Sequence, residues 1–163
     1  MVQLVELDKI DWMILDELQK DGRITNIDLA QRVGISAPPC LRRVRRLEAS
    51  GVIKSYHAAI NGPSIGWSLV VFALIGLVSQ KESVLEEFEL QMEQIPEVRE
   101  CHMVRGGGDF LIRFVARDAE DENRLTHELT SNPHVSKVQT LQTIRTRMER
   151  AGVPLEYSGN KRQ

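Results

Sequence analysis

The sequence predicts an α+β protein with two domains, an N-terminal winged helix-turn-helix followed by a C-terminal ferredoxin-like βαββαβ sandwich. Three observations predict it. Apolar residues recur at helical spacing early in the chain, turn-forming residues interrupt it at Asn61-Gly62-Pro63-Ser64, and strand-like and helix-like stretches then alternate. The predicted boundaries are 1–60 for the first domain, 61–67 for a linker, 68–150 for the second domain and 151–163 for a polar, frayed tail.

Two helices are predicted before residue 35. The first ends at Asp21-Gly22, and its apolar residues share one helical face: Leu7, Ile10, Ile14, Leu15 and Leu18. The second begins where Thr25 and Asp28 resemble a capping box, in which each side chain accepts the other residue's backbone N–H. Gly34 ends the second helix because glycine adopts positive φ freely.

A third helix is predicted in the segment 36–52, SAPPCLRRVRRLEASGV. Ser36 is a suitable cap, and prolines are tolerated in a first helical turn. Cys40, Val44 and Leu47 form the buried stripe, so that Arg42 and Arg46 point outward. Arg45 and the prolines flank the same surface, with Arg43 nearer its edge. Guanidinium groups so placed suit phosphate and guanine contacts, although a solvated basic face has the same pattern.

The residues after this helix, Val52–Ile60, are partly alternating and predict an extended strand or wing. Three helices closed by such a segment make a winged helix-turn-helix, whose partner is double-stranded DNA. Arg42 is the expected base contact because residues near the start of a reading helix reach the base edges. The predicted DNA-binding residues are Thr25, Arg32, Ser36, Pro38, Arg42, Arg45 and Arg46.

The second domain is predicted to contain four strands and two helices. The strands are expected at 69–78, 98–104, 109–116 and 135–148, with the glycine turn Gly106–Gly108 before the third. One helix carries Leu85, Phe88, Met92 and Ile95, with Ser79 or Ser83 as its cap; the other carries Leu125 and Leu129, with Asp118 as its cap.

Apolar residues occupy both parities of the strand at 69–78, so the sheet face without helices also needs to be covered. A second copy of the same face would cover it and give a two-fold dimer. Two reading helices held about one helical turn of DNA apart would then recognise a pseudo-palindromic operator.

Composition favours a cytoplasmic globular protein. The chain has 163 residues, 42% of them hydrophobic, and a net charge of −2. Residues 1–60 carry nine Lys/Arg and eight Asp/Glu, so the positive charge is local to one helix and not general. No apolar run is long enough to span a membrane, no signal peptide precedes the first helix, and two cysteines in separate domains do not indicate disulfides.

Enzyme chemistry is not indicated, and no cofactor or metal is expected. Cys101 and His102 are adjacent on a predicted strand, so their side chains leave opposite faces and do not suit one metal. His127 and His134 lack helical spacing and are expected at the surface, and His57 could contact a phosphate or nothing. No serine or cysteine lies in a nucleophile motif.

Three segments in this order carry a resemblance to a known family: LDKIDWMILDELQKDGRITNIDLAQRVGIS, PPCLRRVRRLEASGVIKSY and ECHMVRGGGDFLIRF. Together they resemble the Lrp/AsnC family of transcription regulators. The resemblance implies a homodimer that assembles further into octamers or similar discs. It also implies a small effector, usually an amino acid, that binds between neighbouring dimers and acts through assembly.

By similarity, the effector would contact these residues: Met103, Val104, Gly106, Gly107, Gly108, Asp109, Thr140, Leu141 and Gln142. Backbone N–H groups of the turn suit an α-carboxylate, and Asp109 suits an α-ammonium. Gly107 stands where relatives often carry an acid, so one possible partner for the ammonium is missing. Gln142 stands where some relatives carry an aliphatic residue, which favours a polar or larger effector over leucine.

Two alternatives stay open at this point. The three glycines could serve only to permit a tight hairpin. An enzyme of the haem-pathway decarboxylase type would have a similar two-domain fold, although such an enzyme has no need for the exposed arginines Arg42, Arg45 and Arg46.

Overall fold

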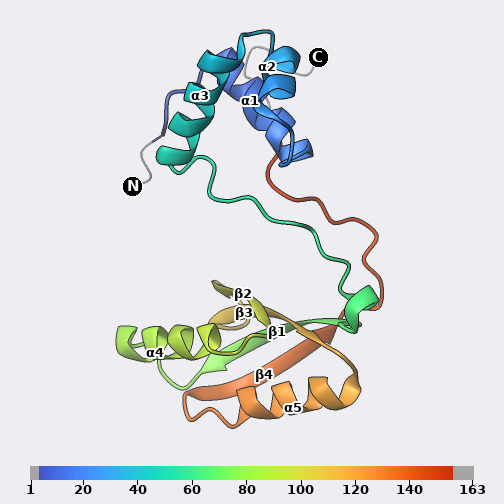
Figure 1. Cartoon of the computed structure of the whole chain (residues 1–163). Helices are drawn as coiled ribbons and strands as arrows, with labels where there is room; N and C mark the ends of the chain where they lie inside the picture. The colour runs from blue at the N-terminus through green and yellow to red at the C-terminus, as the bar shows by residue number, and fades with distance from the viewer. Residues whose placement is uncertain (1–3, 156–163) are drawn as a thin grey trace, which may run out of the picture. The chain divides into compact units, whose positions relative to one another are not determined.

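The computed structural model describes residues 4–155, which divide into two compact units (Figure 1). The first unit contains the chain up to Ala59 and the chain from Met148 onward, and the second contains Ile60–Arg147. No helix among residues 4–155 is long and apolar enough to cross a membrane.

The first unit is built from α1 (Lys9–Lys20), α2 (Asn26–Val33) and α3 (Ala37–Ala49). These are the three predicted helices. Gly34 has φ 74° and ends α2 in the left-handed region, as predicted. Apolar side chains of all three helices form one small core, whose fully buried residues are Ile14, Leu29, Ala30, Val33, Cys40 and Leu47.

The helix caps differ in detail from the prediction. The Thr25 hydroxyl accepts the N–H of Asp28 at 3.2 Å, but the Asp28 carboxylate accepts the Thr25 hydroxyl at 2.6 Å instead of its N–H. Ser36 precedes α3 without a capping side-chain hydrogen bond. The complete capping box lies at the start of α1, where Asp8 and Asp11 each accept the other's backbone N–H.

The strand predicted at Val52–Ile60 is wrong, because the structure has no strand there. A strand requires a hydrogen-bonded neighbour, and no second strand lies beside this segment in the described part of the first unit. Ile53 instead donates its N–H to the carbonyl of Leu47 at 3.1 Å, which turns the chain off the end of α3.

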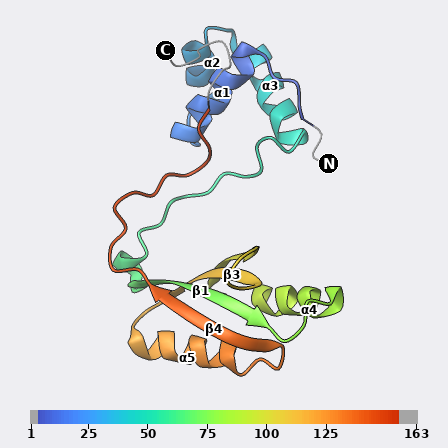
Figure 2. The same ribbon diagram turned by 180° about the vertical axis from the view of Figure 1, so that it is seen from behind.

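The second unit is a four-stranded antiparallel sheet with two helices. Its strands, β1 (Leu69–Leu77), β2 (Val98–Met103), β3 (Phe110–Ala116) and β4 (Val135–Gln142), are ordered β2-β3-β1-β4. The helices α4 (Glu82–Glu93) and α5 (Ala119–Thr130) both cover the same face (Figures 1 and 2). A short 3₁₀ turn, η1 (Pro63–Ile65), precedes β1. The order is the predicted ferredoxin-like βαββαβ.

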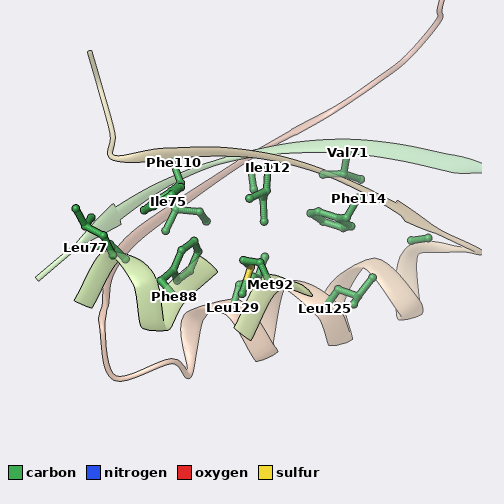
Figure 3. Packing of buried hydrophobic residues seen from close by; sticks show 13 residues of the cluster. Val71, Ile75, Leu77, Phe88, Met92, Phe110, Ile112, Phe114, Leu125 and Leu129 are labelled. Carbon is green, nitrogen blue, oxygen red and sulfur yellow. The ribbon is translucent and has the colours of Figure 1, made fainter. Parts of the chain in front are cut away.

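Alternating residues of the central strands fill the space between the sheet and the helices. Ile75 of β1 and Phe110 and Ile112 of β3 point toward α4 and α5, where they meet Phe88 and Leu129 (Figure 3). The rings of Phe88 and Phe110 are 4.9 Å apart. This packing fixes the positions of the strand ends from which the hairpin between β2 and β3 projects.

Two expectations for the second unit are wrong. α4 has Lys81 as its N-cap residue, and Ser79 accepts the Lys81 N–H while Ser83 already lies inside the helix. β4 ends at Gln142 and does not continue to Met148. Its partner β1 begins at Leu69, and the last bond, from Thr143 N–H to the carbonyl of Val70, leaves nothing beyond with which β4 could pair.

The sheet face opposite the helices, called the open face below, carries apolar side chains that are partly exposed. Strand pairing places Phe72 and Leu74 of β1 on this face beside Leu111 of β3 and Leu141 of β4. Leu141 is 54% exposed. The open face is therefore apolar at its centre, as the mixed parity of β1 predicts.

The chain after β4 returns to the first unit. Gln19 of α1 donates its side-chain amide to the carbonyl of Val153 at 2.8 Å and accepts the Val153 N–H at 3.1 Å. The predicted tail at 151–163 therefore begins with residues that are bound to α1, and residues 156–163 lie outside the described part of the chain.

Candidate nucleic-acid interface and effector turn

The four arginines of α3 fall into two pairs with different surroundings. Arg42 and Arg45 are exposed, and neither makes an ion pair within residues 4–155. Arg43 and Arg46 both bind acidic residues at the start of α1. The helix thus presents two unpaired guanidinium groups and two paired ones.

Asp11 is the centre of the paired group. Its carboxylate is buried, with 1% of the side chain exposed, and it accepts hydrogen bonds from Arg43 Nη1 at 2.8 Å and from Arg46 Nη2. Asp8 accepts a second bond from Arg43 at 2.7 Å. The backbone N–H of Asp11 and the Arg43 guanidinium lower the pKa of Asp8, and the same carboxylates raise the pKa of Arg43.

The other predicted DNA-binding residues lie around this helix. Arg32 of α2 is half exposed and pairs with Glu17 of α1 at 2.8 Å, which lowers the Glu17 pKa. The Thr25 hydroxyl is engaged as the α2 cap. Ser36 and Pro38 are exposed at the start of α3. The predicted residues therefore occupy the first turn and outer surface of α3 and both ends of α2.

Asp8 and Asp11 are absent from the predicted site, although the sequence carries a signal for them. Acidic residues three apart before an apolar repeat are typical of a capping box. That spacing indicates where α1 begins. It does not indicate that Asp11 receives arginines 32 and 35 residues later in the chain.

The glycine turn joins β2 to β3, and one of its glycines is required by close packing. A Cβ atom on Gly108 would lie 2.8 Å from both the Ile75 carbonyl oxygen and Leu74 Cγ. At Gly107 the nearest atom, Leu74 Cδ2, would be at 3.4 Å, which is ordinary contact. Gly106 has φ 144°. The hairpin alternative therefore accounts for Gly106 and Gly108 but not for Gly107.

Asp109, predicted to bind an α-ammonium, is bound within the protein. One carboxylate oxygen accepts the Leu77 N–H at 2.7 Å, and the other accepts the Gln80 side-chain amide at 2.7 Å. Its own N–H donates to the Ile75 carbonyl at 2.7 Å. These bonds fix the carboxylate beside the turn and leave each oxygen one further lone pair.

The predicted effector residues form two groups in one chain. Met103, Val104 and Asp109 lie together at the hairpin, where Val104 donates its N–H to the Asp109 carbonyl at 2.9 Å. Thr140 and Gln142 pair with Ala73 and Val71, and Leu141 pairs with Phe72, whereas the turn lies against the next residues of β1, Leu74 and Ile75. The structure places the first group at the turn and the second group on β4, on the other side of β1 from the β2–β3 hairpin.

The cysteines and histidines do not form a site in the described chain. Cys101 packs on the helix-covered core, and burial raises its pKa to about 11. His102 lies 3.4 Å from Glu100, and His134 lies 3.1 Å from Glu87. No group of three or more His, Cys, Asp or Glu side chains among residues 4–155 is placed to hold a metal ion.

Comparison with known proteins assigns both units. The family described as winged helix-turn-helix DNA-binding matches residues 7–54, and the Lrp/AsnC ligand binding domain matches residues 70–153. The chain belongs to the Lrp/AsnC family. Its first unit is the family's DNA-binding helix-turn-helix and its second the family's ligand-binding domain.

Relatives of this Lrp/AsnC chain are named as regulators. It is 51% identical over 146 residues to the leucine-responsive regulatory protein of Rhizobium meliloti, covering 89% of this chain and 94% of the relative. It is 43% identical over 136 residues to the protein of that name from Escherichia coli, covering 83% of each.

Solved structures that resemble this chain are also named as regulators. A transcriptional regulator from Neisseria meningitidis in complex with L-methionine superimposes with a TM-score of 0.87 at 30% identity, covering 92% of this chain and 97% of that one. The feast or famine regulatory protein of M. tuberculosis, complexed with L-methionine, has a TM-score of 0.81 at 28% identity, covering 91% and 99%. The protein is thus a DNA-binding transcriptional regulator of the Lrp/AsnC family.

Proposed function

We propose that the protein is a cytoplasmic, sequence-specific regulator and not an enzyme. In this proposal a homodimer reads a pseudo-palindromic DNA operator through α3, and an amino acid controls its further assembly. The observation that carries the DNA part is the pair of exposed arginines, Arg42 and Arg45, which have no ion-pair partner among residues 4–155 and lie opposite the stripe that Cys40 and Leu47 bury in the core. A guanidinium without an internal partner is free to bind guanine or phosphate.

Within this reading surface, Arg42 is assigned to a base edge because it lies in the first half of α3 (Ala37–Ala49). Ser36, Pro38 and Arg45 surround it. Arg46 and Arg32 are assigned to phosphates, each while bound to a carboxylate at α1. Thr25 fixes the start of α2, so its contribution is to orient a backbone N–H toward the DNA.

Substitution of single arginines tests this division of roles. Arg42→Ala is expected to cost about 1–3 kcal/mol on the operator and to relax base preference at one position of each half-site. Arg45→Ala is expected to weaken operator and random DNA alike. The operator is first selected from random duplexes with the full-length protein, and both affinities are then measured at one fixed salt concentration. Equal losses on both DNAs for Arg42→Ala would contradict its base contact.

The dimer is proposed to form through the open face. Phe72, Leu74 and Leu111 lie at its centre, and two such faces related by a two-fold axis would cover each other. Sedimentation of the full-length protein is expected to show dimers or larger species at micromolar concentration. Leu111→Lys should shift it toward monomers, whereas Leu90→Lys, at a residue 61% exposed on the outer side of α4, should not.

The effector is proposed to be an amino acid bound at the glycine turn. Backbone N–H groups of Gly106 and Gly107 would receive the α-carboxylate, with Asp109 beside them for the ammonium. The second group, Thr140–Gln142, would come from a neighbouring subunit, because it lies on β4, on the other side of β1 from the β2–β3 hairpin of its own chain. Calorimetric titration with each amino acid tests this, and a preference for leucine over larger or polar side chains would contradict the role given to Gln142.

Control of assembly requires that the effector bind one oligomer more tightly than another. Sedimentation with and without the amino acid found by titration measures this directly. An octamer or similar disc that is unchanged in size and stability at saturating amino acid would refute control through assembly while leaving DNA binding intact.

A further inference from the structure

Four arginines on α3 do not supply four equivalent positive charges. Asp11 is buried, and its two oxygens are used by Arg43, Arg46 and the backbone N–H of Asp8. Asp8 adds a second carboxylate at 2.7 Å from Arg43. The carboxylates of Asp8 and Asp11, at the start of α1, therefore balance the charges of Arg43 and Arg46 on α3.

The cluster is more than a surface ion pair. The Asp11 side chain is 1% exposed, and a buried pair is screened by salt far less than an exposed one. The Arg46 side chain is 53% exposed and binds Asp11 through one terminal nitrogen, so the guanidinium keeps further N–H donors for a second partner. A phosphate that reaches Arg46 must then share the guanidinium with a fixed negative charge.

We infer that Asp11, supported by Asp8, is a positioning residue that holds Arg43 and Arg46 on the protein and limits the charge that α3 offers to DNA. The inference rests on the proposed role of α3 as the reading helix. DNA affinity that depends on charge is independent of sequence, so limiting it lowers binding to random DNA and to the operator alike. Base contact is left to Arg42, which the cluster does not bind.

The measurable consequence is the salt dependence of DNA binding. Each phosphate that a free cation neutralises adds about 0.9 to the slope of log affinity against log salt on duplex DNA. Asp11→Asn leaves an amide oxygen to accept the Asp8 N–H but removes the charge that binds the arginines. The slope on random duplex DNA should therefore steepen by up to about 0.9 for each arginine that gains a phosphate.

Two companion variants separate this effect from altered stability. Asp8→Asn keeps a good helix cap but frees Arg43 from its more exposed partner, so it should steepen the slope less than Asp11→Asn does. Asp16→Asn removes the same charge from α1 but leaves Lys20 paired with Glu17, so its slope should equal that of the original protein. If Asp11→Asn does not fold, the inference is tested by comparing the salt slope of Asp8→Asn with that of Asp16→Asn.

A double variant links the slope to the arginine. In Asp11→Asn/Arg46→Gln the salt slope should be less steep than in Asp11→Asn alone, because the arginine that gained a phosphate is gone. A general loss of structure would not produce this reversal. Folding of every variant is checked by circular dichroism before binding is measured with the full-length protein. A slope unchanged or shallower in folded Asp11→Asn and Asp8→Asn would overturn the inference. Absence of DNA binding by the original protein would instead overturn the role of α3.

Discussion

Replacement of Gly108 by alanine is expected to destabilise the second unit, and its neighbour provides the control. The new Cβ would lie 2.8 Å from the Ile75 carbonyl oxygen and 2.8 Å from Leu74 Cγ. The carbonyl cannot retreat freely because it accepts the Asp109 N–H at 2.7 Å. Overpacking of this kind costs about 1–3 kcal/mol. For a unit of this size, a loss of 1 kcal/mol lowers Tm by about 4–8 °C.

Gly107→Ala adds the same methyl group one residue earlier, where the nearest atom is Leu74 Cδ2 at 3.4 Å. We expect its stability to stay within about 0.5 kcal/mol of the original. Urea unfolding of both variants at one protein concentration, followed by far-ultraviolet circular dichroism, measures the difference. Fixed concentration matters because subunit association adds to apparent stability.

The same pair of variants also distinguishes packing from ligand binding at the turn. If the turn N–H groups receive an α-carboxylate, Gly107→Ala should weaken amino acid binding without loss of stability, because its Cβ stands beside those donors. Equal stability of Gly108→Ala and Gly107→Ala would refute the argument from close approach. Equal amino acid affinity of Gly107→Ala and the original protein would refute the carboxylate site.

Three further predictions concern the helices. Leu47→Ala, at a fully buried site in the first core, should cost about 2–5 kcal/mol in unfolding free energy, whereas Ile27→Ala, 63% exposed, should change it by less than about 0.5 kcal/mol; thermal melts of both variants measure the contrast. Thr25→Ala removes a cap hydrogen bond and should cost about 1 kcal/mol, but Ser36→Ala should cost less because that side chain makes none, and an equal loss in urea unfolding would contradict the assigned caps. The pKa of Asp8 is lowered by the Asp11 N–H and by Arg43, and the pKa of Asp121 is lowered by Arg124 and by the Arg117 N–H. The stability that these carboxylates add is therefore present at neutral pH and lost as the pH falls below about 4. Asp8→Asn should flatten this acid dependence, which urea midpoints measured from pH 6 downward would show.

The sequence alone predicts those elements that depend on the spacing of apolar residues within the element itself. The apolar repeats predict α1, α2 and α3 because each helix buries one stripe, and the same reasoning predicts β1, β3 and the order βαββαβ. Gly34 and Asp118 mark helix ends for reasons contained within a few residues. Where a side chain interacts with its own turn, the sequence carries the information.

The failed predictions depend on partners distant in the chain. Val52–Ile60 has the composition of a strand but no neighbour with which to pair, and β4 stops at Gln142 because β1 begins at Leu69. No feature of the glycine turn alone shows that Gly108 meets Ile75. The pairing of Asp11 with Arg43 and Arg46 likewise joins residues more than 30 positions apart.

The contact between Gln19 and Val153 changes which residues constitute the DNA-binding unit. The chain passes between the units twice, once after Ala59 and again after Arg147, so β4 is connected directly to a segment that is bound on α1. A fragment ending near residue 60 would leave the Gln19 amide without the backbone that satisfies both its donor and its acceptor.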